Sequence, residues 1–329
     1  MPSVNMRTKY LVKVCKMKTG FENNRFYVEY RSPGRPVGNM RQELERAVKE
    51  ISENSKEKLL LSLSSGLDSQ VILHSLHQQG LPFTCAFLYM PGYNDNEYQN
   101  IQLLEKKYGF KSLIVEMDPA KEKDEVLEQA YKEHIYPNNF MHKKFVSLLP
   151  PDMDILTGME GPDIVMNRET GRRLIMEAHW NFESTRLRTL RSVERTGKIL
   201  NIDRNDTSEA LLASILNDSV VLGYVNSLPY ILDNELIDGV TGKKPPAIWN
   251  WNYYIKPIIL GKYWHGELEY FPKYMGIEKI DWIMDCPIRQ TYHCDVAFVE
   301  YNNLKKFLSR DTVDTIRIYD TRPTSQSSN

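Results

Sequence analysis

The sequence is poor in cysteine, has almost no net charge and contains no long apolar run, and each shortage excludes a class of protein. Four cysteines among 329 residues are too few and too scattered for a disulfide framework, so a reducing, cytoplasmic environment is expected. Lys and Arg number 42 against 43 Asp and Glu, which argues against an overall electrostatic grip on nucleic acid or anionic lipid. The longest uncharged run, residues 69–94, contains His74, Gly80 and Pro82 and predicts helix, turn and strand rather than a membrane span. The protein is therefore expected to be soluble.

The rest of the composition is that of a globular protein, with 41% hydrophobic and 26% charged residues. A chain of this length is expected to divide into parts. Alternating apolar and polar positions in residues 8–31 predict a β-hairpin around a polar turn at 18–24. We therefore expect an N-terminal hairpin region (1–39), an α/β core (40–165) and a C-terminal part (166–329).

From residue 58 onward, short apolar runs alternate with segments of helical period. Strands are predicted at 59–63, 83–90, 112–117 and 153–157, with helices between them. This alternation predicts an α/β fold in which a parallel sheet carries helices on both faces. Past residue 161 no clear strands are predicted. Residues 172–217 have a mostly helical period and 249–282 are rich in aromatics, so the C-terminal part is expected to be mainly helical.

The most informative segment joins the first of these strands to the helix that follows it. Small residues fill the turn, and small side chains let the backbone approach a ligand closely. The helix start offers N–H groups that suit a phosphate. A carboxylate such as Asp68 fits beside phosphates when it holds a divalent cation. The alternative is an ordinary strand-to-helix turn in which Asp or Ser caps the helix.

Residues 64–69, Ser-Ser-Gly-Leu-Asp-Ser, resemble the SGGxDS pyrophosphate loop of the N-type ATP pyrophosphatases, or PP-loop superfamily. Ser65 stands where that family has its first Gly. Residues 154–163 resemble the second signature of the asparagine synthetase branch, a strand followed by Gly-Glu-Gly-Ala-Asp, with departures at Met159 and Ile164. Residues 94–97 resemble the Asp-Glu of that branch. Both signatures, in order on consecutive strand–helix units, favour a synthetase domain like that of asparagine or β-lactam synthetase.

The resemblance implies a HUP-like adenine nucleotide alpha-hydrolase fold, with ATP as ligand and Mg²⁺ as cofactor. Carried over to this chain, Asp68 and Asp163 would hold the Mg²⁺. Nucleotide contacts would come from Ser62, Ser64, Ser65, Gly66, Leu67, Asp68, Ser69, Phe87, Leu88, Gly158 and Gly161. Catalytic roles would fall to Glu160 and to a late lysine, for which Lys256 and Lys273 are the candidates.

The function implied is an adenylating ligase that forms AMP and pyrophosphate and activates a carboxylate for attack by ammonia or an amine. Position 2 is Pro2, not the cysteine nucleophile of a glutaminase domain, so ammonia would be free or supplied by a partner. A homodimer stays open. One alternative is a PP-loop enzyme that modifies a nucleobase in tRNA or DNA, with a basic stripe as its contact. The stripe comprises Arg186, Arg188, Arg191 and Arg195. The other alternative is a catalytically decayed homologue with a nucleotide-binding or structural role.

Overall fold

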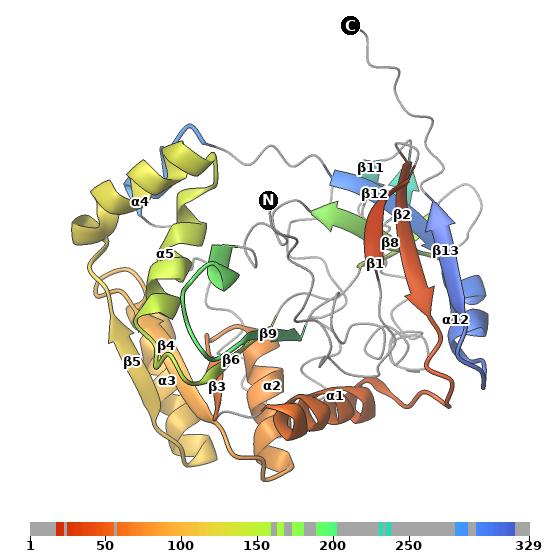
Figure 1. Cartoon of the computed structure of the whole chain (residues 1–329), viewed down its shortest axis with the longest axis horizontal. Coiled ribbons are helices and arrows are strands. Elements are labelled where there is room, and N and C mark those ends of the chain that lie inside the picture. The colour runs from red at the N-terminus through yellow and green to blue at the C-terminus, as the bar shows by residue number, and fades with distance from the viewer. Residues whose placement is uncertain are drawn as a thin grey trace, which may run out of the picture.

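A five-stranded parallel sheet forms the centre of the computed structural model, which describes residues 18–22, 25–55, 58–158, 163–167, 173–180, 189–202, 230–232, 235–237, 280–288 and 294–319. The strand order is β5-β4-β3-β6-β9 (Figure 1). The strands are β3 (Leu59–Ser62), β4 (Thr84–Tyr89), β5 (Ser112–Glu116), β6 (Asp154–Gly158) and β9 (Ile199–Ile202). The chain enters at the centre on β3, continues outward to β4 and β5, and then crosses back to β6 and β9. The predicted α/β fold with a parallel sheet is therefore confirmed.

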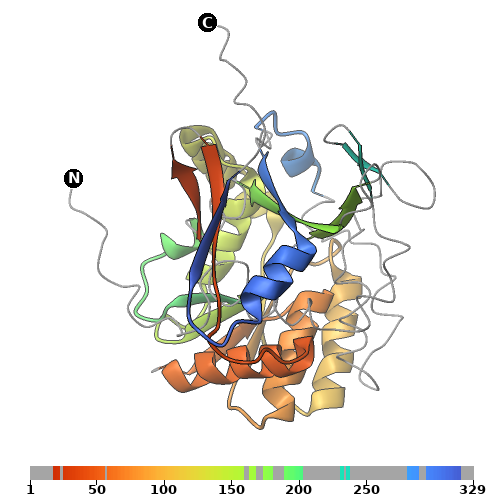
Figure 2. The same cartoon turned by 90° about the vertical axis from the view of Figure 1, so that its right-hand side faces the viewer.

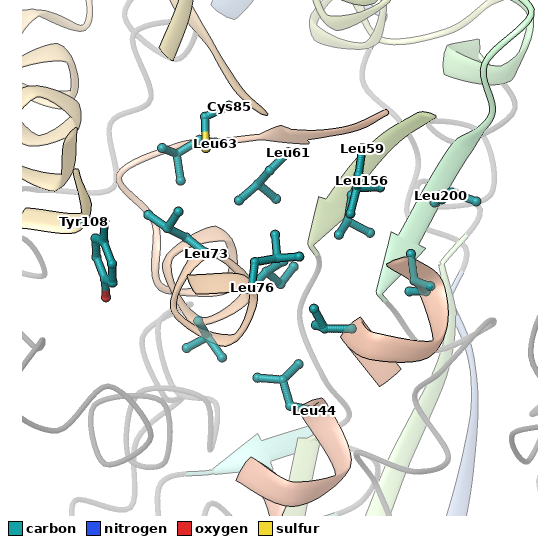
Figure 3. Close-up of a cluster of buried hydrophobic side chains, with 14 of the residues drawn as sticks. Leu44, Leu59, Leu61, Leu63, Leu73, Leu76, Cys85, Tyr108, Leu156 and Leu200 are labelled. Atoms are coloured by element: carbon teal, nitrogen blue, oxygen red, sulfur yellow. The ribbon is translucent and has the colours of Figure 1, made fainter. Parts of the chain in front are cut away.

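Helices cover both faces of this sheet, as the sequence predicts. Successive residues of β3 point to opposite faces, so Leu61 and Leu60 belong to two different buried clusters. The cluster around Leu61 draws on α1 (Met40–Asn54), α2 (Leu67–Gln78), α3 (Asp95–Tyr108) and α12 (Tyr301–Leu308). The cluster around Leu60 draws on α4 (Pro119–Glu133), α5 (Pro137–Ser147) and α11 (Asp281–Met284). Figure 3 shows Leu61 directed toward Leu73 and Leu76 of α2.

The N-terminal hairpin is present, but its first strand lies later in the chain than predicted. β1 (Lys18–Glu22) pairs antiparallel with β2 (Arg25–Arg31), so residues expected in the turn form a strand. The register places Lys18 opposite Glu29 and Glu22 opposite Arg25. Facing opposite charges stabilise a polar strand pair, which apolar alternation alone does not reveal. Residues 8–17 lie outside the described residues.

A C-terminal strand completes the sheet that the hairpin begins. β13 (Thr315–Tyr319) pairs with β2, so segments from both ends of the chain lie side by side (Figure 2). The Arg317 guanidinium donates to Glu29 at 2.8 Å and lies 4.3 Å from the centre of the Tyr27 ring. These contacts fasten the last strand to the hairpin.

The prediction of a mainly helical C-terminal part is wrong for the described residues. Five strands form a second sheet in the order β11-β10-β7-β8-β12. They are β7 (Asp163–Asn167), β8 (Arg173–Trp180), β10 (Tyr230–Leu232), β11 (Glu235–Ile237) and β12 (Cys294–Glu300). In β8 the apolar residues Leu174, Ile175 and Met176 are consecutive, so its local pattern does not alternate cleanly, and its strand form rests on its long antiparallel pairing with β12. β9 also falls in the stretch predicted as helical, and it lies beyond residue 165 although it belongs to the parallel sheet.

None of the helices in the described part of the chain is long and apolar enough to cross a membrane.

Candidate functional site

The loop of residues 64–69 lies at the point where the strand order of the parallel sheet reverses. It follows the carboxyl end of β3, which pairs with β4 on one side and β6 on the other (Figure 1). Ser62 ends β3 and Gly158 ends the neighbouring β6, so both predicted contacts lie at this edge. In open parallel sheets, ligands bind outside the carboxyl ends of the strands at such a reversal. The topology therefore places the predicted loop at the preferred ligand position of the fold.

Hydroxyl groups hold this loop closed. Ser69 Oγ accepts a hydrogen bond from Ser64 N at 3.0 Å and lies 2.8 Å from Ser64 O. The two serine hydroxyls are 3.0 Å apart, and Gly66 N donates to Ser64 Oγ at 3.2 Å. Two of the predicted phosphate donors thus make contacts within the loop. A ligand at this position would compete with these contacts or use the main-chain N–H groups instead.

The start of α2 has no side-chain capping bond at its N-cap residue. Its N-cap is Gly66, whose extended backbone (φ −71°, ψ 151°) leads into the helix without a side-chain cap. The first main-chain bond of the helix runs from Gln70 N to Gly66 O at 3.2 Å. The N–H groups before Gln70 in the first turn have no partner within the helix, and the positive end of the helix dipole lies at these groups. This arrangement argues against the alternative of a simple capped turn.

Ser65, the departure from the family pattern, links the loop to α3. Ser65 is buried, and its hydroxyl donates to Glu97 Oε1 at 3.3 Å. The Gln70 carboxamide donates to Ser65 O at 2.6 Å and so fastens the same residue from α2. Sequence reasoning missed both partners. Glu97 could have been found, because it belongs to the acidic segment 94–97 at the start of the next helix.

The carboxyl end of β4 is held by a carboxamide. Asn94 Nδ2 donates to Leu88 O at 2.8 Å, and Asn94 Oδ1 accepts from Met90 N at 2.7 Å. The predicted nucleotide contacts Phe87 and Leu88 are buried in the two hydrophobic clusters on opposite faces of the sheet. Their side chains are part of the core, so a nucleotide at this strand would meet its main chain.

The structure gives the backbone positions of both predicted metal ligands. Asp68 lies in the first turn of α2, and Asp163 is the first residue of β7. The side chains of Asp68, Leu67 and Asp163 are outside the described part, as are the whole residues Glu160, Gly161, Lys256 and Lys273. Among the described side chains, no three His, Cys, Asp or Glu residues form a candidate metal site.

The basic stripe of the nucleobase alternative is not a continuous helix face. The helical turn at 189–191 ends before Arg195. The Arg195 guanidinium donates instead to main-chain oxygens of its own protein: Gly197 at 3.1 Å, Val146 at 3.3 Å, Pro150 at 2.9 Å and Met153 at 2.5 Å. These contacts hold loops together, and the contact of the stripe with a polyanion stays a prediction. Arg186 and Arg188 lie outside the described residues.

No protein-family model matches this chain, and no curated protein matches it either. Its function is therefore inferred from its own residues and from their place in the fold.

Proposed function

We propose that this protein is an ATP-dependent ligase that forms AMP and pyrophosphate, of the asparagine synthetase type to which its two motifs are similar. The observation that carries the proposal is the uncapped start of α2, preceded by a loop of small residues at the strand-order reversal. Main-chain N–H groups aimed from a helix start suit a pyrophosphate group. The four-residue match in the loop, Ser64, Gly66, Asp68 and Ser69, adds the specific resemblance.

Catalysis in this proposal is positioning and charge stabilisation. The loop 64–69 and the first turn of α2 bind the β- and γ-phosphates of ATP and hold the α-phosphorus in line with an acceptor carboxylate. The carboxylate oxygen attacks the α-phosphorus, pyrophosphate leaves, and an acyl-adenylate results. Ammonia or an amine then attacks the acyl carbon, and AMP leaves. The N–H groups of α2 stabilise the negative charge that builds up on the departing pyrophosphate.

The residue types that the motifs supply suit a magnesium ion. Mg²⁺ prefers oxygen ligands, and the candidates are Asp68, in the first turn of α2, and Asp163, the first residue of β7. The Glu97 carboxylate also lies beside the loop, through its contact with Ser65. Acidic residues beside bound phosphates need a compensating positive charge. When bound, Mg²⁺ would supply that charge and neutralise the phosphate oxygens. Asp68 and Asp163 would hold it.

The products of ATP cleavage test the proposal. The protein is incubated with Mg-ATP, pooled amino acids and ammonium, and AMP, ADP, pyrophosphate and phosphate are quantified. We expect AMP and pyrophosphate, abolished in Asp68→Asn and retained in Asp124→Asn, a matched change at an exposed site on α4. ADP with phosphate would contradict the PP-loop assignment. ATP binding without turnover across a broad panel of acceptors would contradict the ligase and favour the decayed homologue.

A further inference from the structure

β4 extends past the end of β3 and presents a short main-chain edge at the strand-order reversal. The hydrogen bond from Leu63 N to Ala86 O, 2.9 Å, joins the two strands where β3 ends. Alternate residues of a strand turn their N–H and C=O to the same side. Leu88 O and Met90 N therefore face the side of Ala86, beyond the end of β3. Tyr89 O faces the other way and accepts from Met117 N at 2.9 Å.

A side chain of the protein itself fills this edge. The Asn94 carboxamide bonds both Leu88 O and Met90 N, at 2.8 and 2.7 Å, and Asn94 is only 4% exposed. Asn94 is also the N-cap residue of α3, a position where an Asn side chain usually caps the helix. Here the side chain makes no capping bond to α3. It is turned toward β4 instead, and its Nδ2 also donates to the Glu97 carboxylate of α3 at 3.4 Å.

The carboxamide that fills this edge has the same donor and acceptor pattern as one edge of a nucleobase. A carboxamide carries its N–H donor and its oxygen acceptor on one carbon. In adenine, the 6-amino donor and the N1 acceptor are likewise both bonded to one carbon. A group of that geometry spans Leu88 O and Met90 N at normal hydrogen-bond lengths, as Asn94 demonstrates. The same edge lies on the strand next to β3, from which the proposed phosphate loop starts.

We infer that the Asn94 side chain competes with the adenine base of the nucleotide for Leu88 O and Met90 N. It must leave these two main-chain groups before the base binds there. This inference rests on the proposed function, in which ATP occupies this edge of the sheet. Asn94 then lowers nucleotide affinity, because the base must replace two hydrogen bonds that the empty protein already makes. Removal of the Asn94 side chain leaves both main-chain groups without that partner, and adenine then supplies the two lost hydrogen bonds.

Calorimetric titration with Mg-ATP and with adenosine tests this role. Asn94→Ala is expected to bind both ligands about tenfold more tightly than the wild type, the equivalent of one to two net hydrogen bonds. Asn94→Ser keeps a favoured N-cap residue but is too short to span both groups, so it should show the gain even if Asn94→Ala folds poorly. Asn96→Ala, an exposed neighbour in the first turn of α3, should bind as the wild type does.

The ligand supplies the second control. Purine riboside lacks the 6-amino donor, so its affinity should gain much less from Asn94→Ser than that of adenosine. Wild-type binding of ATP with equal or weaker binding by both Asn94 variants would overturn this inference and show Asn94 to be a brace. The ligase proposal would survive that result. Failure of the wild type and both variants to bind ATP or adenosine would overturn the inference together with the proposed function.

Discussion

The two ends of the parallel strands are built differently. At the amino ends, charged side chains are surrounded by partners. The Asp154 carboxylate accepts from Ser55 Oγ at 2.5 Å and from Lys198 N at 2.6 Å. The Glu105 carboxylate accepts from Ser112 N at 2.7 Å, at the start of β5. Arg195 adds bonds to main-chain oxygens around the starts of β6 and β9.

At the carboxyl ends most of the described contacts of the loop and of β4 join main-chain groups, hydroxyls and a carboxamide, and the Glu97 carboxylate accepts from Ser65. The start of α2 has no side-chain cap, and the serine hydroxyls of the loop bond within the loop. Asn94 fills the edge of β4 with two hydrogen bonds to neutral main-chain groups. Neutral contacts of this kind can be exchanged for those of a ligand, whereas the charged contacts at the amino ends have main-chain partners whose loss would cost stability. The contacts at the amino ends therefore stabilise the fold, and the carboxyl ends carry the proposed binding site.

The largest effect is expected for Gly197→Ala at the amino ends. An added Cβ would lie 2.0 Å from Met153 O, so the segments before β6 and β9 must move apart. We expect the free energy of unfolding, measured by urea denaturation, to fall by at least about 3 kcal/mol. Gly80→Ala is the control, because its Cβ meets nothing within 4 Å and only its positive φ of 61° adds strain. That strain costs about 1 kcal/mol. Equal losses in both variants would contradict the close contact.

The next effect concerns a buried group that belongs to neither end. Burial, with help from the charges of Arg41, His77 and Lys107, lowers the pKa of His74 to about 4 from an ordinary 6.5. The unfolded chain therefore takes up a proton at higher pH than the folded protein does, and stability falls as the pH drops from 6.5 toward 4. The loss attributable to His74 should approach about 3 kcal/mol at pH 4. His74→Gln should flatten the unfolding free energy over this window. An unchanged pH profile would show that His74 accepts a proton in the folded state.

Arg195→Ala should cost about 2 kcal/mol, because carbonyl oxygens of the loop before β6 lose a charged donor. Arg310→Ala is the matched control, since the Arg310 side chain is half-exposed and its contacts are an ion pair with Asp314, four residues later, and a cation–π contact with Phe307. That change should cost less than about 0.5 kcal/mol. Filter binding of tRNA and duplex DNA should not distinguish Arg195→Ala from the wild type. Reduced nucleic-acid affinity in a fully folded variant would instead support the basic stripe as a nucleic-acid contact.

Patterns in neighbouring residues correctly predicted those features that depend on neighbouring residues. The small residues at 64–66, between an apolar run and a helical period, located the loop correctly. β8 was missed because its partner β12 lies more than a hundred residues later, and hydrogen bonds across that separation override the local period. The contacts Ser65–Glu97 and Asn94–Leu88 also depend on how separate elements meet. Motif matching could assign residue types to the site, but it could not show that the hydroxyls and a carboxamide already have partners. Joint metal binding by Asp68 and Asp163 stays a prediction.

The smallest expected effect is a gain in stability rather than a loss. It distinguishes buried polar groups that stabilise the fold from those that do not. Asn139, in the first turn of α5, is fully buried, and neither polar atom of its carboxamide has a hydrogen-bond partner within the described structure. Gln70 is equally buried, but its carboxamide donates to Ser65 O. Asn139→Leu should raise the free energy of unfolding by about 1 kcal/mol, and Gln70→Met should lower it by a similar amount. Destabilisation by Asn139→Leu would mean that an ordered water or a ligand satisfies the amide.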